Sequence, residues 1–248
     1  MSSLSEEIEK SLQNQKKAKI ITKGHAIREK LLLSIRDANA EQAQKMFQEA
    51  NAYLSVDDPM DLLGRIEGSQ LRSHKNFMLS HNSMYALMAE FGGLDPVLSH
   101  YLSEKYAILI ESSKASNELE RLHDQMVEKY SSPKHRFAFN EDMPLSLKVQ
   151  NYIANHFMND LNIQMIADEF YVTKEHLMRQ FKKEMGITVN DEIKKSRLDE
   201  AEDMLQSSHL SVTNIAIMVG YNSVQYFSTV FKEVYGVTPT EFQKQKNK

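Results

Sequence analysis

Apolar side chains recur every three or four residues along most of this chain, the interval typical of amphipathic α-helices. This spacing predicts a helix that Thr22 caps and that runs to about Arg36. Four further helices are predicted on the same grounds: one capped by Asn39, one from about Ser69 to Phe91, one opened by Asp95-Pro96, and one over roughly Lys114 to Tyr130. No segment alternates apolar and polar residues strongly enough to predict a sheet, so we expect an all-α protein.

Residues 132–144 interrupt this pattern and divide the chain. They hold two of its five prolines, Pro133 and Pro144, among mostly polar residues. Segments of this composition commonly join domains. We therefore expect residues 1–131 to form a helical domain, residues 132–144 to form a linker, and residues 145–248 to form a second domain.

The expected second domain contains an internal repeat. Ile166-Ala167 recurs as Ile215-Ala216 49 residues later, and Phe181-Lys182 recurs as Phe231-Lys232 50 residues later. The difference of one residue places a single insertion in the turn of the second copy. Each copy predicts a short helix, a tight turn and a second helix ended by glycine, which is the layout of a helix-turn-helix.

The second helix of each copy carries mostly polar side chains on the face that points away from the predicted core. In the first copy these residues are Lys174, Glu175, Met178, Arg179 and Lys182. In the second copy they are Gln225, Tyr226, Thr229 and Lys232, with Ser223 as the N-cap and Val224 pointing inward. Arg, Gln, Thr and Glu can read base edges in the DNA major groove, and Lys can bind phosphate. A polar helix face is usually only solvated, but two copies at nearly constant spacing favour DNA binding.

A predicted helix from about Thr188 to Gln206, without internal Gly or Pro, joins the two copies. At 1.5 Å per residue this helix would be roughly 28 Å long. Successive major-groove segments lie roughly 34 Å apart, so the helix suits two recognition helices in adjacent segments. After the second copy, Thr238-Pro239-Thr240-Glu241 forms a capping box that predicts a short final helix.

The repeat resembles the DNA-binding domain of AraC-type transcriptional regulators. The similarity is carried by Gly220-Tyr221-x-Ser223-x-x-Tyr226-Phe227-x-x-x-Phe231-Lys232-x-x-x-Gly236-x-Thr238-Pro239, by Ile215-Ala216 before it, and by Arg197, Ala201 and Leu205 in the joining helix. The resemblance implies two DNA-binding helix-turn-helix units joined by a long helix. It also implies base contacts at Glu175, Met178 and Arg179 in the first copy, and at Val224, Gln225, Tyr226 and Thr229 in the second.

The residues before the linker are similar to helical regions of some Gram-positive AraC-type regulators. The matching residues are Arg72-x-x-Lys75-Asn76, Gly92-Gly93-Leu94-x-Pro96 and Leu102-Ser103-Glu104-x-Tyr106. This resemblance implies an N-terminal part that dimerises, senses or contacts a partner. Besides double-stranded DNA, the candidate partners are a second copy of the chain in a homodimer, RNA polymerase, and a small-molecule or protein effector bound at the N-terminal domain. No run approaches the roughly 18 apolar residues that span a bilayer, so we expect no membrane partner.

The amino-acid composition excludes several classes of function. The chain has no Cys, which excludes disulfides, thiolate metal sites and cysteine nucleophiles. It lacks the glycine-rich phosphate-binding motifs and the G-x-S-x-G elbow, so we expect no enzyme and no cofactor. His74 and His81 could share a helix face, but no close carboxylate pairing accompanies them, so we expect no metal site. The polar N-terminus and the lack of Cys are compatible with the cytoplasm, where we expect the protein to act.

The charge balance leaves one alternative open. The whole chain has a net charge of −4, and residues 145–248 hold 12 Lys and Arg against 13 Asp and Glu, a net charge of −1. That balance also suits a helical protein-interaction module whose helix-turn-helix units no longer bind DNA tightly. An enzymatic function is a distant third alternative.

Overall fold

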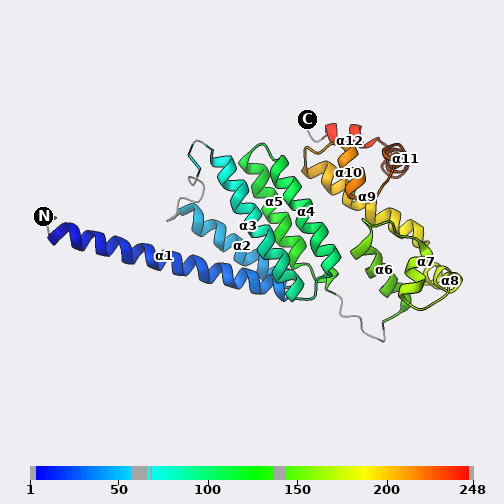
Figure 1. The fold of residues 1–248 in the computed structure, drawn as a ribbon, viewed down its shortest axis with the longest axis horizontal. Coiled ribbons are helices and arrows are strands. Elements are labelled where there is room, and N and C mark those ends of the chain that lie inside the picture. The colour runs from blue at the N-terminus through cyan, green and yellow to red at the C-terminus, as the bar shows by residue number, and fades with distance from the viewer. Residues whose placement is uncertain (1–3, 57–65, 68, 137–142, 246–248) are drawn as a thin grey trace. The chain divides into compact units, whose positions relative to one another are not determined.

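The computed structural model describes residues 4–56, 66–67, 69–136 and 143–245, which fold into α-helices (Figure 1). The helices are α1 (Leu4–Arg36), α2 (Ala40–Val56), α3 (Gln70–Phe91), α4 (Pro96–Ser112), α5 (Ser116–Ser131), α6 (Leu145–His156), α7 (Ile163–Glu169), α8 (Lys174–Met185), α9 (Val189–Ser207), α10 (Val212–Met218), α11 (Val224–Tyr235) and α12 (Pro239–Gln245), with a short 3₁₀ helix η1 (Pro133–His135). No β-strand occurs within the described ranges, so the predicted all-α fold class is confirmed. None of these helices is long and apolar enough to cross a bilayer.

Side-chain caps confirm where several predicted helices begin. Before α2, Asn39 Oδ1 accepts a hydrogen bond of 3.0 Å from the Gln42 N–H. Before α4, Asp95 Oδ1 accepts bonds of 2.9 and 3.2 Å from the N–H groups of Val97 and Leu98. These oxygens satisfy N–H groups that the first helical turn leaves unpaired. Short polar residues in the sequence therefore set the start of these two helices.

The predicted start of the first helix is wrong. α1 begins at Leu4, so Thr22 lies inside it. The Thr22 hydroxyl donates a hydrogen bond of 2.9 Å to the Ala18 carbonyl, one helical turn earlier. A threonine hydroxyl can either cap a helix or bond back to the preceding turn. Because residues 4–21 contain neither Gly nor Pro, nothing stops the helix before Thr22.

Contacts within the chain define two compact units. The first comprises residues 1–92 and 114–133, and the second comprises residues 93–113 and 134–248. α4 therefore belongs to the second unit, although it precedes the expected linker in the sequence. Residues 137–142 of that linker lie outside the described residues, and the expected division at residues 132–144 stays a prediction.

The first unit is a bundle in which α1, α2, α3 and α5 pack together. Its buried side chains include Ile35, Phe47 and Met78. Gly92 ends α3 at a point where a Cβ atom would lie 1.7 Å from the Arg36 carbonyl oxygen. Only a glycine permits this close approach of the chain to the end of α1.

Histidines in this bundle take part in hydrogen bonding and aromatic packing. His74 is buried, and His81 Nδ1 lies 2.9 Å from the Phe77 carbonyl oxygen, one turn before it. A third histidine, His123, is buried with its Nε2 3.0 Å from the Tyr85 hydroxyl. Burial lowers the pKa of His123 well below its usual value, which favours the neutral ring. Among the described residues, no group of three or more His, Asp or Glu side chains is placed to hold a metal ion.

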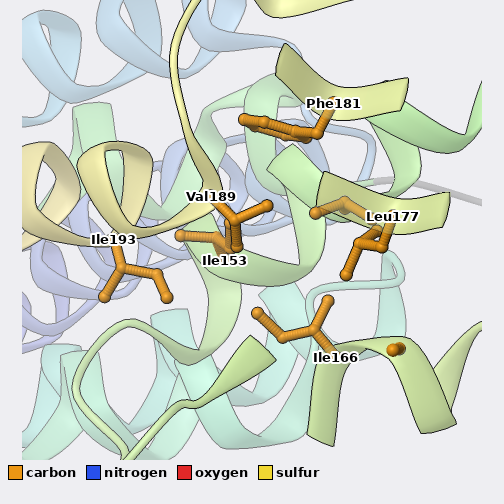
Figure 2. Packing of buried hydrophobic residues seen from close by; sticks show 8 residues of the cluster. Ile153, Ile166, Leu177, Phe181, Val189 and Ile193 are labelled. Atoms are coloured by element: carbon orange, nitrogen blue, oxygen red, sulfur yellow. The ribbon is translucent and has the colours of Figure 1, made fainter. Parts of the chain in front are cut away.

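The second unit has two apolar cores that share α9. In the first core, α6, α7, α8 and the start of α9 bury the cluster Val149, Ile153, Ile166, Ala167, Leu177, Phe181, Val189 and Ile193. Figure 2 shows these side chains pointing from separate helices into one interior. In the second core, α10 and α12 pack on α9, and α11 packs on both α10 and α12. The two helix-turn-helix copies are therefore built on opposite parts of one helix.

α4 joins this unit through a buried ion pair with α9. Lys105 Nζ lies 2.5 Å from Glu200 Oε1, and the two side chains are only 5% and 6% exposed. The Tyr101 hydroxyl donates a bond of 3.3 Å to the same oxygen. The Tyr101 ring also packs edge-on against Phe157, which follows α6. Because a buried charge is stable only with a bonded partner, this pair holds α4 at one position on α9.

Removing one member of the pair should destabilise the protein more than removing both. Lys105→Met would leave the Glu200 carboxylate buried without its cation, a loss of roughly 3–5 kcal/mol. The double variant Lys105→Met/Glu200→Leu removes both charges and should recover most of that loss. Denaturation in urea followed by circular dichroism measures the two differences. Equal stability of the single and double variants would contradict a coupled buried pair.

Candidate nucleic-acid interface

The two copies of the repeat have matching elements. α7 and α10 each contain 7 residues, and α8 and α11 each contain 12. Residues 170–173 separate the first pair of helices, whereas residues 219–223, one residue more, separate the second pair. The predicted single insertion in the second turn is therefore confirmed.

The second helix of each copy begins and ends at corresponding residues. Thr173 Oγ1 accepts the His176 N–H at 3.2 Å before α8, and Ser223 Oγ accepts the Tyr226 N–H at 3.2 Å before α11. Both helices end at a glycine in the left-handed region, Gly186 with a φ of 74° and Gly236 with a φ of 79°. Thr173 was not singled out in the sequence, although its offset of 50 residues from Ser223 identifies it as the equivalent cap.

The inner faces of these helices are apolar and buried as expected. Leu177 and Phe181 of α8 are fully buried, as are Phe227 and Phe231 of α11. Val224, which was expected to point inward, is half-buried. Burial of one face fixes which residues the opposite face presents to solvent.

The opposite faces present the predicted site residues together. Lys174, Glu175, Met178, Arg179 and Lys182 are all exposed along α8. On and before α11, the exposed residues are Ser223, Gln225, Tyr226, Thr229 and Lys232. With the 50-residue offset, the two sets fall largely on the same positions of the two helices. The structure therefore gathers each set on one helix face, and their contact with DNA stays a prediction.

Hydrogen bonds within the helices leave these faces able to bind a ligand. The Thr229 hydroxyl donates to the Gln225 carbonyl at 3.0 Å, so its oxygen keeps acceptor capacity outward. The Ser223 hydroxyl lies 3.3 Å from Gln225 Oε1 and can steady that amide. On α8, Arg179 Nη2 lies 3.4 Å from His176 Nδ1, and the exposed guanidinium has further donors available.

The predicted capping box after the second copy is confirmed. The Thr238 hydroxyl and N–H donate to Glu241 Oε2 at 2.7 and 2.8 Å, and the Glu241 N–H lies 3.3 Å from Thr238 Oγ1. Hydrogen bonds from Thr238 lower the pKa of the exposed Glu241 carboxyl. The box starts α12, which packs on α9 and α11 and closes the second core.

The turns of the two copies share a left-handed residue but differ in their surroundings. Tyr171 has a φ of 54° in the first turn, and its side chain is 95% exposed. Gly220 has a φ of 88° in the second turn, where a Cβ atom would lie 2.8 Å from the Met158 carbonyl oxygen and 3.0 Å from that of Phe157. The first turn therefore tolerates a large residue at the cost of backbone strain, whereas the second requires glycine.

Gly220→Ala should destabilise the protein more than Gly236→Ala. Both glycines have a positive φ, so alanine is strained by roughly 1–2 kcal/mol at either position. A Cβ at Gly236 would meet no atom within 4 Å, whereas one at Gly220 would press on two carbonyl oxygens. We expect overpacking to add roughly 1–3 kcal/mol at Gly220 alone. Urea denaturation of both variants measures the difference, and equal losses would show that the second turn can relax.

Comparison with known proteins identifies this region as a known type of domain. Residues 166–245 match the family model described as a helix-turn-helix domain. The xylose operon regulatory protein of Escherichia coli K12 is 34% identical over 100 residues, which cover 40% of this chain and 26% of that protein. A protein described as an HTH-type transcriptional regulator in the cgkA 5′ region of Pseudoalteromonas carrageenovora is 38% identical over 99 residues, which cover 39% of this chain and 58% of that protein.

Among solved structures, the C-terminal domain of AraT, a response regulator from Geobacillus stearothermophilus, aligns with a TM-score of 0.41 at 33% identity. The alignment covers 43% of this chain and 88% of that one. This chain spans about a quarter of the length of the xylose operon regulatory protein. The residues matched by the family model run from within α7, through both recognition helices and α9, to the end of α12. Residues 166–245 therefore form a helix-turn-helix domain, and the predicted resemblance to AraC-type regulators is confirmed for this part of the chain.

Proposed function

We propose that this chain is a sequence-specific, DNA-binding transcription regulator that inserts α8 and α11 into adjacent major-groove segments. The observation that carries the proposal is the duplication of the outer face: two helices of 12 residues, capped and ended at equivalent residues, expose side chains at equivalent positions. A helix exposed on one face and 12 residues long fits the major groove. Two such helices on one rigid support suit a single DNA face.

The distribution of charge supports DNA binding despite the net charge of −1. α8 carries four basic and two acidic residues, whereas α9 carries three basic and six acidic residues. Two of the acidic residues of α9 are buried and bonded, Glu192 to Gln150 at 2.9 Å and Glu200 to Lys105. The acidity therefore lies largely on the helix that joins the copies, while the first recognition helix is basic and suited to phosphate.

The exposed residues can be assigned roles by their chemistry. Arg179 can donate two bonds to a guanine, Gln225 can pair with an adenine, and Glu175 can accept from a cytosine amine. Met178 and the half-buried Val224 can contact a thymine methyl group. The remaining residues suit backbone or mixed contacts: Lys174, Lys182 and Lys232 to phosphate, and Ser223, Tyr226 and Thr229 to phosphate or base edges.

The N-terminal helices form the regulatory part in this proposal. The matched relatives include proteins named as operon or transcription regulators, and the two described above align with 39–40% of this chain. For the N-terminal helices, the proposed roles are a homodimer contact, a contact with RNA polymerase, or the site of a small-molecule or protein effector. The proposal places the protein in the cytoplasm, without enzymatic activity of its own.

The alternative is a protein-interaction module whose helix-turn-helix units do not bind DNA tightly. Genome-wide mapping of DNA occupancy in the native host separates the two functions. Discrete occupied sites sharing one sequence motif are expected for a DNA-binding regulator. Absence of any enriched site, with the protein expressed and folded, would favour the interaction module.

Arg179→Ala should weaken specific DNA binding without affecting the fold. The side chain is exposed and lies outside the buried face of α8, so its loss should cost roughly 1–3 kcal/mol of binding to a selected site. Binding to unrelated DNA should change much less. Arg121→Ala, an exposed arginine of α5, removes the same charge elsewhere and serves as the control in the fluorescence titration. Unchanged specific affinity of Arg179→Ala would refute the base contact.

The spacing of the two recognition helices should make binding sensitive to insertions between the two DNA subsites. A half-turn insertion of about five base pairs rotates one subsite to the far face of the DNA and should abolish two-copy binding. A full-turn insertion of about ten base pairs restores the face but adds about 34 Å of separation, which a stiff α9 cannot span. We therefore expect one-copy affinity on both DNAs in a gel-shift titration. Full affinity on the ten-base-pair insert would show that α9 bends or melts.

A further inference from the structure

Arg197, near the middle of α9, is bonded to the end of α6. Its Nε donates a hydrogen bond of 2.8 Å to the Phe157 carbonyl, and its Nη2 donates one of 2.7 Å to the Asn159 carbonyl. Both carbonyls lie just after the last turn of α6, and the Asn159 carbonyl also accepts the Leu161 N–H at 2.8 Å. Hydrogen bonds from a guanidinium are charge-assisted and fixed in direction by its planar fork. α6 in turn supplies Val149 and Ile153 to the first core, so these bonds attach Arg197 to the first helix-turn-helix copy.

The same guanidinium also contacts the second copy. Its central carbon lies 5.4 Å from the centre of the Tyr221 ring, the distance of a cation–π contact. Tyr221 lies in the turn between α10 and α11, and it is 6% exposed. Next to it, a Cβ at Gly220 would lie 3.1 Å from Arg197 Nε. The absence of a side chain at Gly220 thus gives the second turn room to approach Arg197 and the end of α6.

We propose that Arg197 is a positioning residue that sets the angle between the two recognition helices, a role that rests on the proposed DNA-binding function. α9 fixes how far apart the two copies lie. A helix alone does not fix how each copy is rotated about it, because each copy packs on its own part of the helix surface. Arg197 adds a contact that reaches both copies at once, through two hydrogen bonds on one side and an aromatic ring on the other.

This role predicts how DNA recognition depends on Arg197. With the angle fixed, only one spacing and one rotation of the two subsites accommodates both helices. Without Arg197, each copy can still bind its subsite, but the protein accepts a wider range of spacings. Lysine keeps the charge but cannot make two parallel bonds or stack as a flat group, so Arg197→Lys should behave largely like Arg197→Met.

The angle can be measured without DNA. The chain contains no Cys, so Lys183→Cys on α8 and Glu233→Cys on α11 introduce two unique attachment points at exposed positions. Spin labels attached to these two cysteines report the distribution of distances between the recognition helices by pulsed electron paramagnetic resonance. We expect one narrow distribution with Arg197 and a broadened or shifted one with Arg197→Lys and Arg197→Met. Lys195→Met, which removes an exposed cation from the same helix, should leave it narrow.

DNA titrations test the consequence with full-length protein. The measured quantity is the affinity for the preferred site divided by the affinity for the same site with one base pair added between its subsites. We expect this ratio to fall roughly tenfold in Arg197→Lys, equivalent to about 1.4 kcal/mol, while binding to DNA with a single subsite stays unchanged. A purely structural role would weaken binding to every DNA equally and leave the ratio intact, which would overturn the proposal.

The two experiments separate the inference from the function on which it rests. If the protein with Arg197 shows no sequence-specific DNA binding, the proposed function fails, and the label distances still decide whether Arg197 holds the helices. If the distance distribution is unchanged in both Arg197 variants, the positioning role is wrong whatever the DNA result. Circular dichroism establishes that each variant is folded, and should Arg197→Met unfold, Arg197→Lys carries both measurements.

Discussion

The architecture of the second unit depends on α9, whose apolar side chains are buried in one core near its start and in a second core further along. Val189 and Ile193 complete the first core, and Leu198, Ala201, Met204 and Leu205 are buried further along the helix. The buried apolar area of one helix therefore stabilises two helix-turn-helix copies at once. Neither copy can leave α9 without exposing that surface to water. A helix of 19 residues that is free of Gly and Pro also resists bending between the copies.

Local chemistry explains why much of this fold could be predicted from the sequence. Asn39, Ser69 and Asp95 are short polar residues placed before apolar repeats, and each acts through bonds within its own helical turn. The two helix-turn-helix copies could also be predicted, because two similar segments of one chain can be compared directly with each other. Local chemistry alone did not predict the role of Thr22. Its hydroxyl can either cap a helix or bond to the preceding turn, and it bonds to the preceding turn because no Gly or Pro upstream stops the helix.

Interactions between distant residues explain what could not be predicted. Lys105 and Glu200 lie 95 residues apart, and in sequence each is an ordinary charge on a helix, where solvent exposure is the expectation. The same holds for Arg197, whose acceptors are backbone carbonyls and carry no residue signature. For the candidate site, the helix period identified which side chains face outward. The base that each would contact depends on the shape and sequence of the DNA as well as on the protein.

The contrast between Tyr171 and Gly220 has a consequence for how this domain can diversify. The first turn is open, with the Tyr171 side chain almost wholly in solvent, whereas the second is pressed against the end of α6. Substitutions at Tyr171 can therefore accumulate with little repacking. The second turn is packed closely against its neighbours, so a substitution at Gly220 would have to be compensated elsewhere. The two turns of a duplicated unit thus differ in evolvability: the first is open to new side chains, and the second is constrained to glycine.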